Sequence, residues 1–191
     1  MNYQFKTLEL PEVIVFMPEK FFDERGFFYE SFNSFKFTKE TGKIFNILQE
    51  NISLSKKNVL RGLHFQKGEH QQSKLIHVEK GRILDVIVDI RPGSKNFRKW
   101  ISYELDDNIN ESIFIPRGFA HGFLTLEDFT KISYKVDNLY NKNSECSISW
   151  NDPELMIDWQ SINPILSKKD MIAISFEENF QKNNFMTKEI I

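Results

Sequence analysis

Short runs in which apolar and polar residues alternate recur along most of the chain. Such alternation is the pattern of strands that bury one face. The runs are separated by Gly, Pro, Asn and Asp, which are typical of turns. We therefore predict strands within residues 1–20, 21–32, 44–55, 59–66, 74–78, 82–89, 100–105, 112–115 and 131–136. Many short strands at regular spacing predict a mostly β fold, a β-sandwich or barrel.

Two segments depart from the alternation. Residues 33–42 are polar with two phenylalanines, and they predict a short helix or a loop closed by Gly42. Residues 167–180 have the best helical pattern, with Ser167 as the N-cap, so we expect one helix near the C-terminus. No linker or low-complexity tract interrupts the chain, and 191 residues fit one domain, residues 1–191.

The stretch at residues 59–66 places an arginine and a histidine inside an apolar run, V-L-R-G-L-H-F-Q. Strand side chains alternate in direction, so Arg61 and His64 would face opposite sides of a regular strand. Gly62, between them, is the residue that would allow a bend or bulge there. A strand of this kind predicts a functional site.

Composition limits the class of protein. The net charge of −2 favours neither nucleic acid nor an anionic membrane as a partner. The single cysteine, Cys146, excludes an internal disulfide and suits a reducing compartment. We see no signal sequence and no apolar run long enough to span a membrane, so we expect a cytoplasmic protein.

An ordered set of motifs runs through nearly the whole chain. They are R-G-F-F-Y-E (25–30), Q-E-N-I-S (49–53), L-R-G-L-H-F-Q (60–66), K-L (74–75), D-V-I-V-D-I-R (85–91), I-P-R-G-F-A-H-G-F (115–123), Y-K (134–135), W-N-D-P-E-L (150–155) and L-S-K-K-D (166–170). This set resembles the dTDP-4-keto-6-deoxyglucose (dTDP-4-dehydrorhamnose) 3,5-epimerases over about residues 16–170, followed by a C-terminal helical tail. The resemblance implies a cupin-like jelly roll, a homodimer, no metal or other cofactor, and a nucleotide-linked 4-keto sugar as substrate.

Inverting a carbon beside a ketone requires a base, a group that stabilises the enolate, and an acid on the opposite face. The resemblance assigns these roles to four residues. His64 is the base, Asp170 is the carboxylate that orients it, Lys74 is the cation near the C4 oxygen, and Tyr134 is the acid. Taken singly, each side chain also has an ordinary structural interpretation, such as a core histidine or a solvated lysine. The assignment therefore depends on the ordered motifs.

The resemblance assigns nine further residues to substrate binding. Arg25 and Arg61 form the diphosphate clamp, since guanidinium groups match phosphate oxygens. The nucleotide-facing and pocket-lining residues are Glu30, Gln49, Asn51, His121, Tyr140, Glu145 and Lys169. Leu139 stands where relatives commonly have an aromatic residue, which leaves the identity of the sugar open.

A metal site is not expected. Pro116, Gly118 and His121 are spaced as in the second half of the metal-binding cupin signature. The first half needs a His-x-His pair, which does not occur in this sequence. Three or four protein ligands are usual for a tight transition-metal site. A metal-dependent cupin is the disfavoured alternative, and a non-catalytic sugar-binding jelly roll is another.

Within the epimerase class, several alternatives stay open. The protein could invert one centre rather than both, and the sugar could be a GDP-linked 4-keto heptose for a capsule. Oligomeric state follows only from the resemblance. The phenylalanine-rich N-terminal third could offer an exposed apolar strand to a second copy.

Overall fold

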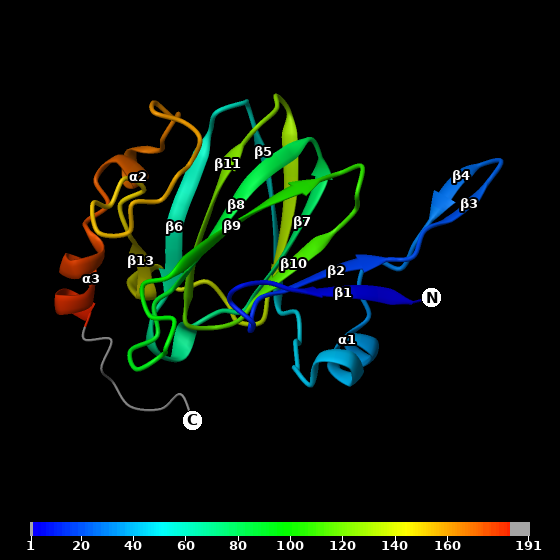
Figure 1. The fold of residues 1–191 in the computed structure, drawn as a ribbon, viewed down its shortest axis with the longest axis horizontal. Helices are drawn as coiled ribbons and strands as arrows, with labels where there is room; N and C mark the ends of the chain where they lie inside the picture. Colours follow the sequence, from blue (N-terminus) through cyan, green and yellow to red (C-terminus); the bar gives the residue numbers. More distant parts are fainter. Residues whose placement is uncertain (1, 184–191) are drawn as a thin grey trace.

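The structure is a computed structural model and describes residues 2–183 (Figure 1). One sheet has six strands, in the order β1 (Tyr3–Thr7), β2 (Ile14–Pro18), β10 (Ser112–Ile115), β7 (Lys74–Lys80), β12 (Thr130–Val136) and β5 (Gln49–Ser55). A second has five, in the order β13 (Glu145–Ser147), β6 (Leu60–Gln66), β11 (Phe119–Thr125), β8 (Arg82–Asp89) and β9 (Trp100–Asp106). The remaining elements are the hairpin β3 (Phe21–Asp23) and β4 (Gly26–Phe28), and the helices α1 (Ser34–Thr41), α2 (Lys168–Met171) and α3 (Phe176–Asn183).

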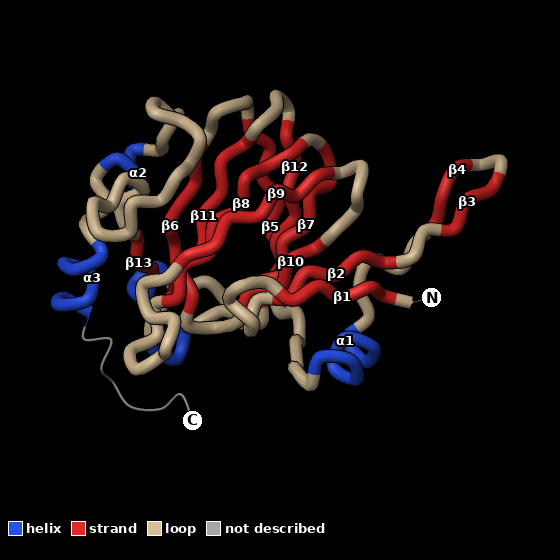
Figure 2. Tube along the Cα trace, viewed as in Figure 1, coloured by secondary structure: helices blue, strands red, loops and turns tan. Residues whose placement is uncertain are grey.

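The two sheets face each other as an open cupin-like jelly-roll sandwich, which confirms the predicted mostly β fold. Strands fill the middle of the molecule and helices lie at its periphery (Figure 2). The inner faces share one apolar cluster, and fully burying each such side chain contributes about 1.5–3 kcal/mol. Its members from both sheets include Ile76, Ile113, Ile132, Ile83, Ile87 and Phe119.

Each sheet also has a covered outer face. The C-terminal segment packs on the five-stranded sheet through Leu155, Trp159 and Phe176, in one cluster with strand residues such as Leu63. On the six-stranded sheet, Phe37 of α1 lies in a second cluster. The other members of that cluster are Phe16, Phe45, Leu75 and Phe114. Because both outer faces are covered by apolar clusters, the polar side chains in the space between the two sheets are the candidates for a functional site.

The predicted irregularity in β6 is confirmed. His121 of β11 pairs with His64, whereas Phe123 pairs with Arg61, so two residues of β11 span three of β6. This extra residue is a β-bulge, and it brings Arg61 and His64 to the same face of the strand. Gly62, at the bulge, has φ of 122°, and a Cβ there would lie 2.5 Å from the Cα of Gly122. Only glycine fits this position.

The predicted C-terminal helix over residues 167–180 is wrong as a single element. Ser167 does cap a helix, since its side chain accepts from the amide of Asp170, but that helix is α2 and ends at Met171. Ile174 then forms a bridge with Ile148, and its carbonyl accepts a hydrogen bond from the amide of Ser149. This long-range pairing holds the chain extended before α3 begins at Phe176. The local pattern of apolar residues cannot reveal a pairing between residues so far apart in the sequence.

Other boundaries differ in smaller ways. Residues 33–42 contain the helix α1, capped by Asn33 and ended by Gly42 with φ of 70°, so the helix rather than the loop is confirmed. The strand expected from residue 44 begins only at Gln49. The short strand β13 had no clear alternation and was not predicted.

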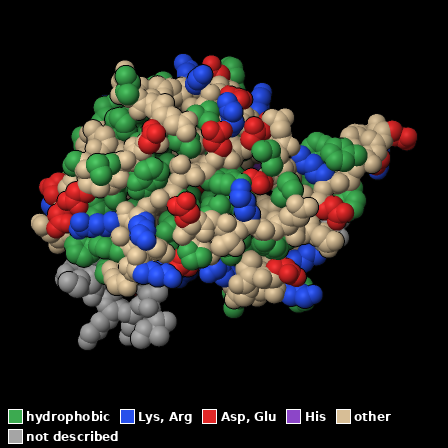
Figure 3. Space-filling model, in the orientation of Figure 1, with side chains coloured by type: hydrophobic (Ala, Val, Ile, Leu, Met, Phe, Trp, Pro, Cys, Tyr) green, Lys and Arg blue, Asp and Glu red, His purple; other side chains and the backbone are tan. Residues whose placement is uncertain are grey.

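The hairpin β3–β4 projects from the sandwich (Figure 1). Phe22, Phe27 and Phe28 are exposed on it, and apolar side chains gather on this arm in the space-filling view (Figure 3). A soluble domain rarely exposes several neighbouring aromatic rings without a binding partner.

Candidate active site

Eleven of the thirteen candidate residues lie on or beside the inner faces of the two sheets. The five-stranded sheet contributes Arg61 and His64 from β6, His121 from β11 and Glu145 from β13. The six-stranded sheet contributes Lys74 from β7, Tyr134 from β12, and Gln49 and Asn51 from β5. Tyr140, Lys169 and Asp170 lie on the loop after β12 and on α2, and hydrogen bonds join them to this group. The sandwich therefore has an apolar half and a polar half.

His64 and Asp170 form a hydrogen-bonded pair between β6 and α2. The His64 Nε2 lies 2.6 Å from the Asp170 Oδ1, and the carboxyl group is 3% exposed. The other Asp170 oxygen accepts from the Ser167 hydroxyl at 2.7 Å. A carboxylate in this place fixes the proton on one ring nitrogen and leaves the lone pair of the other as a base.

Burial lowers the pKa of the His64 imidazole below its ordinary value, although the hydrogen bond with Asp170 acts in the opposite direction. For the Asp170 carboxyl, burial alone would raise the pKa. Hydrogen bonds from His64 and Ser167 outweigh that effect, so the pKa of Asp170 lies below its ordinary value. At neutral pH the pair is thus a neutral imidazole beside an ionised carboxylate, the state that a general base needs.

Lys74 reaches across the sandwich from the opposite sheet. Its Nζ donates to the backbone carbonyl of His64 at 3.1 Å, which sets the ammonium close to the candidate base. Burial lowers the pKa of Lys74 to about 8; the carboxylates of Asp85 and Glu145 act against this lowering, and Lys169 adds to it. An ammonium held in such surroundings can stabilise a negative oxygen.

Tyr134 lies on the inner face of β12, where it pairs with Asn51 of β5 and Ile76 of β7. It packs against the apolar core and is partly buried. Among the described residues, no group hydrogen-bonds its hydroxyl. A phenol that is neutral at pH 7 and not already engaged can donate a proton to a bound molecule.

A chain of hydrogen bonds links five candidate residues from both sheets, α2 and the loop after β12. Glu145 pairs with Lys169 and accepts from the Tyr140 hydroxyl at 3.0 Å. The Tyr140 amide donates to the Gln49 side chain at 3.1 Å, and Gln49 donates to Asn51 at 2.8 Å. Burial would raise the pKa of the Glu145 carboxyl, but Lys169 and Tyr140 together hold it below its ordinary value. These polar groups suit a polar ligand entering between the sheets.

Arg25 and Glu30 are not brought to this site within one chain. Arg25 lies on the projecting hairpin with its side chain 85% exposed and paired to Asp23. Glu30 lies at the base of the hairpin, where Lys36 donates to it at 2.7 Å. Arg61 does lie at the site and donates to the Ser55 hydroxyl at 3.2 Å. A diphosphate clamp made of both arginines is therefore not assembled within a single chain.

Sequence reasoning missed Asp85, whose Oδ1 lies 2.7 Å from the Nε2 of His121. The signal was present in D-V-I-V-D, where an acid interrupts an apolar strand. Within residues 2–183, no three His, Cys, Asp or Glu side chains gather closely enough to hold a metal ion. In the same range no helix is long and apolar enough to cross a membrane.

The comparisons with known proteins agree with one another. The family model of dTDP-4-dehydrorhamnose 3,5-epimerase matches residues 7–178. The Escherichia coli (strain K12) dTDP-4-dehydrorhamnose 3,5-epimerase is 46% identical over 171 residues, covering 89% of this chain and 92% of that protein.

Solved structures show the same fold. The dTDP-6-deoxy-D-glucose-3,5-epimerase of Legionella pneumophila, in complex with dTDP-4-keto-L-rhamnose, superposes with a TM-score of 0.92 at 36% identity and full coverage of both chains. A 3'-monoepimerase of Streptomyces bikiniensis, in complex with dTDP-quinovose, has a TM-score of 0.86 at 30% identity, over 92% of this chain and 89% of that one. Since the family model matches residues 7–178 and the Escherichia coli relative is 46% identical, the chain belongs to the dTDP-4-dehydrorhamnose 3,5-epimerase family, a family of isomerases.

Proposed function

We propose that this protein epimerises dTDP-4-keto-6-deoxyglucose at C3 and C5 to give dTDP-4-keto-rhamnose. One observation carries the proposal. A candidate base, His64, and a candidate acid, Tyr134, come from opposite sheets, with the ammonium of Lys74 beside the base. A sugar ring lying between the sheets would meet a base on one face and an acid on the other, as inversion requires.

The chemistry follows from the C4 ketone, which acidifies the protons on both neighbouring carbons. His64 removes a proton from C3 or C5, and the electron pair forms an enolate with its charge on the C4 oxygen. Lys74 stabilises that charge. Tyr134 then donates a proton to the same carbon from the other face. Because both centres share one ketone, one ammonium can serve both inversions. No metal or other cofactor enters these steps.

Asp170 supports the base in this scheme. When His64 takes up a proton, the neighbouring carboxylate stabilises the imidazolium that forms. Glu145, Lys169 and Tyr140 would bind polar groups of the nucleotide sugar. Arg61 would bind a phosphate oxygen, since it is exposed and lies beside Ser55 of β5.

We propose further that the protein works as a homodimer in the cytoplasm, with the projecting hairpin of one copy reaching the site of the other. Three exposed phenylalanines on the hairpin would then be covered, and Arg25 would join Arg61 at the diphosphate. The symmetry of a dimer would complete both sites at once. This explains why a motif arginine lies far from the remaining motif residues in one chain.

A subunit-mixing experiment tests the shared site. Arg25→Ala and His64→Ala chains would each be inactive alone, but a mixed dimer contains one site with an intact His64 and an intact Arg25 from the other copy. Recovered turnover after mixing and reassociation is expected. No recovery in mixtures shown by native mass spectrometry to contain mixed dimers would overturn the shared site.

The reaction itself is tested by turnover of dTDP-4-keto-6-deoxyglucose in deuterated water, followed by mass spectrometry of the sugar. Gain of two deuterons, absent in His64→Ala, is the expected result. Gain of one would mean inversion of a single centre. This is the next candidate reaction, because a monoepimerase has the same fold. No gain would overturn the proposed substrate, and a GDP-linked 4-keto heptose, the capsule alternative, would then be tried.

A further inference from the structure

Asp85 is an acid in the middle of an apolar strand face. It lies on β8 between Ile83 and Ile87, which both belong to the core shared by the two sheets. Its side chain is 0% exposed. A carboxylate without solvent needs compensating partners, because burial of an unpaired charge is strongly unfavourable.

The partners of Asp85 are incomplete. One oxygen, Oδ1, lies 2.7 Å from the His121 ring. The other, Oδ2, is buried and has no hydrogen-bond partner among the described residues. Buried polar atoms are nearly always satisfied, so an exception at a site calls for a functional reason.

Lys74, on the facing sheet, is connected to that charge through the two histidines. Its Nζ donates to the backbone carbonyl of His64, His64 pairs with His121 between β6 and β11, and the His121 ring lies 2.7 Å from Asp85. The charged groups that act on the Lys74 ammonium are the carboxylates of Asp85 and Glu145, which favour its protonated form, and Lys169, which opposes it. Glu145 is already paired to Lys169. Asp85 is therefore the carboxylate whose effect on Lys74 is not offset by a cation of its own.

We propose that Asp85 is a positioning residue for the reaction, whose buried carboxylate keeps the Lys74 ammonium charged and fixes the orientation of the His121 ring. The inference rests on the proposed function, since it concerns the group that stabilises the enolate. Asp85 need not touch the sugar. Its carboxylate lies within hydrogen-bond distance of the His121 Nε2 and so fixes the orientation of that ring.

The geometry gives the role a chemical reason. An enolate oxygen is stabilised by an ammonium but not by a neutral amine, so Lys74 must hold its proton while the site is dry. A buried counter-charge achieves this without occupying the space of the substrate. Because Oδ2 accepts no hydrogen bond from the described residues, no closer donor partly neutralises the carboxylate charge that acts on Lys74.

The test is Asp85→Asn, which keeps the size of the side chain and one acceptor oxygen but removes the charge. Lys74 is followed by NMR of its ε-carbon in protein labelled with ¹³C,¹⁵N-lysine, and its signal is assigned by its loss in Lys74→Arg. We expect Lys74 to lose its proton at lower pH in Asp85→Asn than in the wild type. The alkaline limb of kcat/KM should move in the same direction, with turnover near pH 8 reduced about tenfold.

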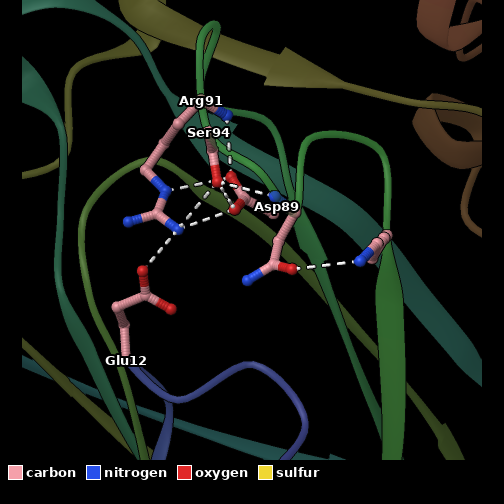
Figure 4. A network of polar contacts seen from close by, with 6 residues as sticks. Glu12, Asp89, Arg91 and Ser94 are labelled. Carbon is pink, nitrogen blue, oxygen red and sulfur yellow. Dashed lines mark hydrogen bonds and ion pairs between the residues drawn. The ribbon is translucent and has the colours of Figure 1, made fainter.

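Asp89→Asn is the matched control. Asp89 is also 0% exposed and lies four residues along the same strand face, but its oxygens bind Arg91 and Ser94 (Figure 4). This variant should leave the Lys74 titration and the alkaline limb unchanged, even where it unfolds more easily. Should Asp85→Asn fail to fold, Asp85→Ser, which still presents a hydroxyl to His121, serves as the second variant with the same expected shift.

The role of Asp85 and the proposed function would be overturned by different results. An unchanged Lys74 titration in folded Asp85 variants would overturn the role of Asp85, whatever the activity. A shifted titration in a protein whose wild type neither turns over nor exchanges the substrate would instead overturn the proposed function.

Discussion

Two buried polar clusters lie in this sandwich, and they differ in how completely their buried aspartate is hydrogen-bonded. In the first, both oxygens of Asp89 are engaged, by the Arg91 guanidinium at 2.9 and 2.6 Å and by the Ser94 hydroxyl at 2.6 Å. Glu12 adds a second carboxylate, whose Oε1 accepts from Arg91 at 3.0 Å and whose buried Oε2 has no partner among the described residues. Figure 4 shows this cluster tying a turn to the N-terminal segment.

The second cluster is the candidate active site, and it is left incomplete. Asp85 has an oxygen without a partner, and the Tyr134 hydroxyl has none within the part of the chain that the structure describes. Lys74 carries three donor hydrogens but, among the described residues, donates to one acceptor, the carbonyl of His64. The contrast lies in the two buried aspartates: the fully paired carboxylate of Asp89 stabilises the fold, whereas the unpaired groups around Asp85 and Lys74 are available for the reaction.

The largest expected effect separates the clusters by activity. His64→Asn keeps a polar side chain of similar size but cannot act as a base at neutral pH. Turnover should fall about 10³-fold, the usual range for loss of a general base. The free energy of unfolding in urea should change little, because the asparagine amide can still donate a hydrogen bond to the buried Asp170 carboxylate. Steady-state kinetics and urea titration on the same preparation measure both, and a variant that keeps a tenth of its activity would place the base elsewhere.

The next prediction separates the clusters by stability. Arg91→Ala leaves the Asp89 carboxylate buried without its cation, and breaking such a pair lowers the free energy of unfolding by about 3 kcal/mol. Turnover per folded molecule should stay as in the wild type. Urea unfolding followed by fluorescence is the measurement.

Glu12→Gln is the control for that variant. Glu12 is one-third exposed and makes a single contact with Arg91, through Nη2, so its loss should change the stability far less. A fall in kcat in Arg91→Ala that exceeds the fraction unfolded would contradict the separation of the two clusters.

The sequence predicted most strands because alternation reports which face of a strand is buried, and that is a local property. It failed where a distant partner decides the conformation. The break between α2 and α3 depends on Ile174 pairing with Ile148, and β13 exists only because β6 lies beside it. The bulge at Gly62 was foreseen since two polar residues three apart conflicted with a regular strand.

The candidate site was predicted from motifs more than from physics. His64 and Asp170 are 106 positions apart, and nothing local to either indicates that they meet. Asp85 stands in a strand and in a motif, but neither indicates that its side chain meets His121, 36 positions away. Arg25 shows the opposite limit, since its motif is clear and yet a single chain leaves it exposed on an arm.

The smallest expected effect is a shift with pH, and it distinguishes titration of the site from unfolding. The pKa of Lys74 is about 8, so kcat/KM should fall about tenfold for each pH unit above that value as the ammonium is lost. The acid limb should lie below pH 6.5, because burial lowers the pKa of His64. Stability should follow another course, since Lys74 has a lower pKa folded than unfolded. The unfolded chain then binds more protons above pH 8, and stability from this group rises with pH.

The Asp89 cluster stabilises the fold to the same extent throughout the pH range in which Lys74 titrates. Burial alone would raise the pKa of the Asp89 carboxyl, but the bonds from Arg91 and Ser94 hold it below its ordinary value. Its stabilising effect is therefore full above the unfolded pKa and is lost only as pH falls through the lower, folded one. Urea titrations and kcat/KM measured together from pH 5.5 to about 9.5 should diverge above pH 8, activity falling while Lys74 no longer destabilises the fold. If Lys74→Met showed the same rise of stability with pH as the wild type, that rise would not belong to Lys74, and the alkaline limb would need another titrating group.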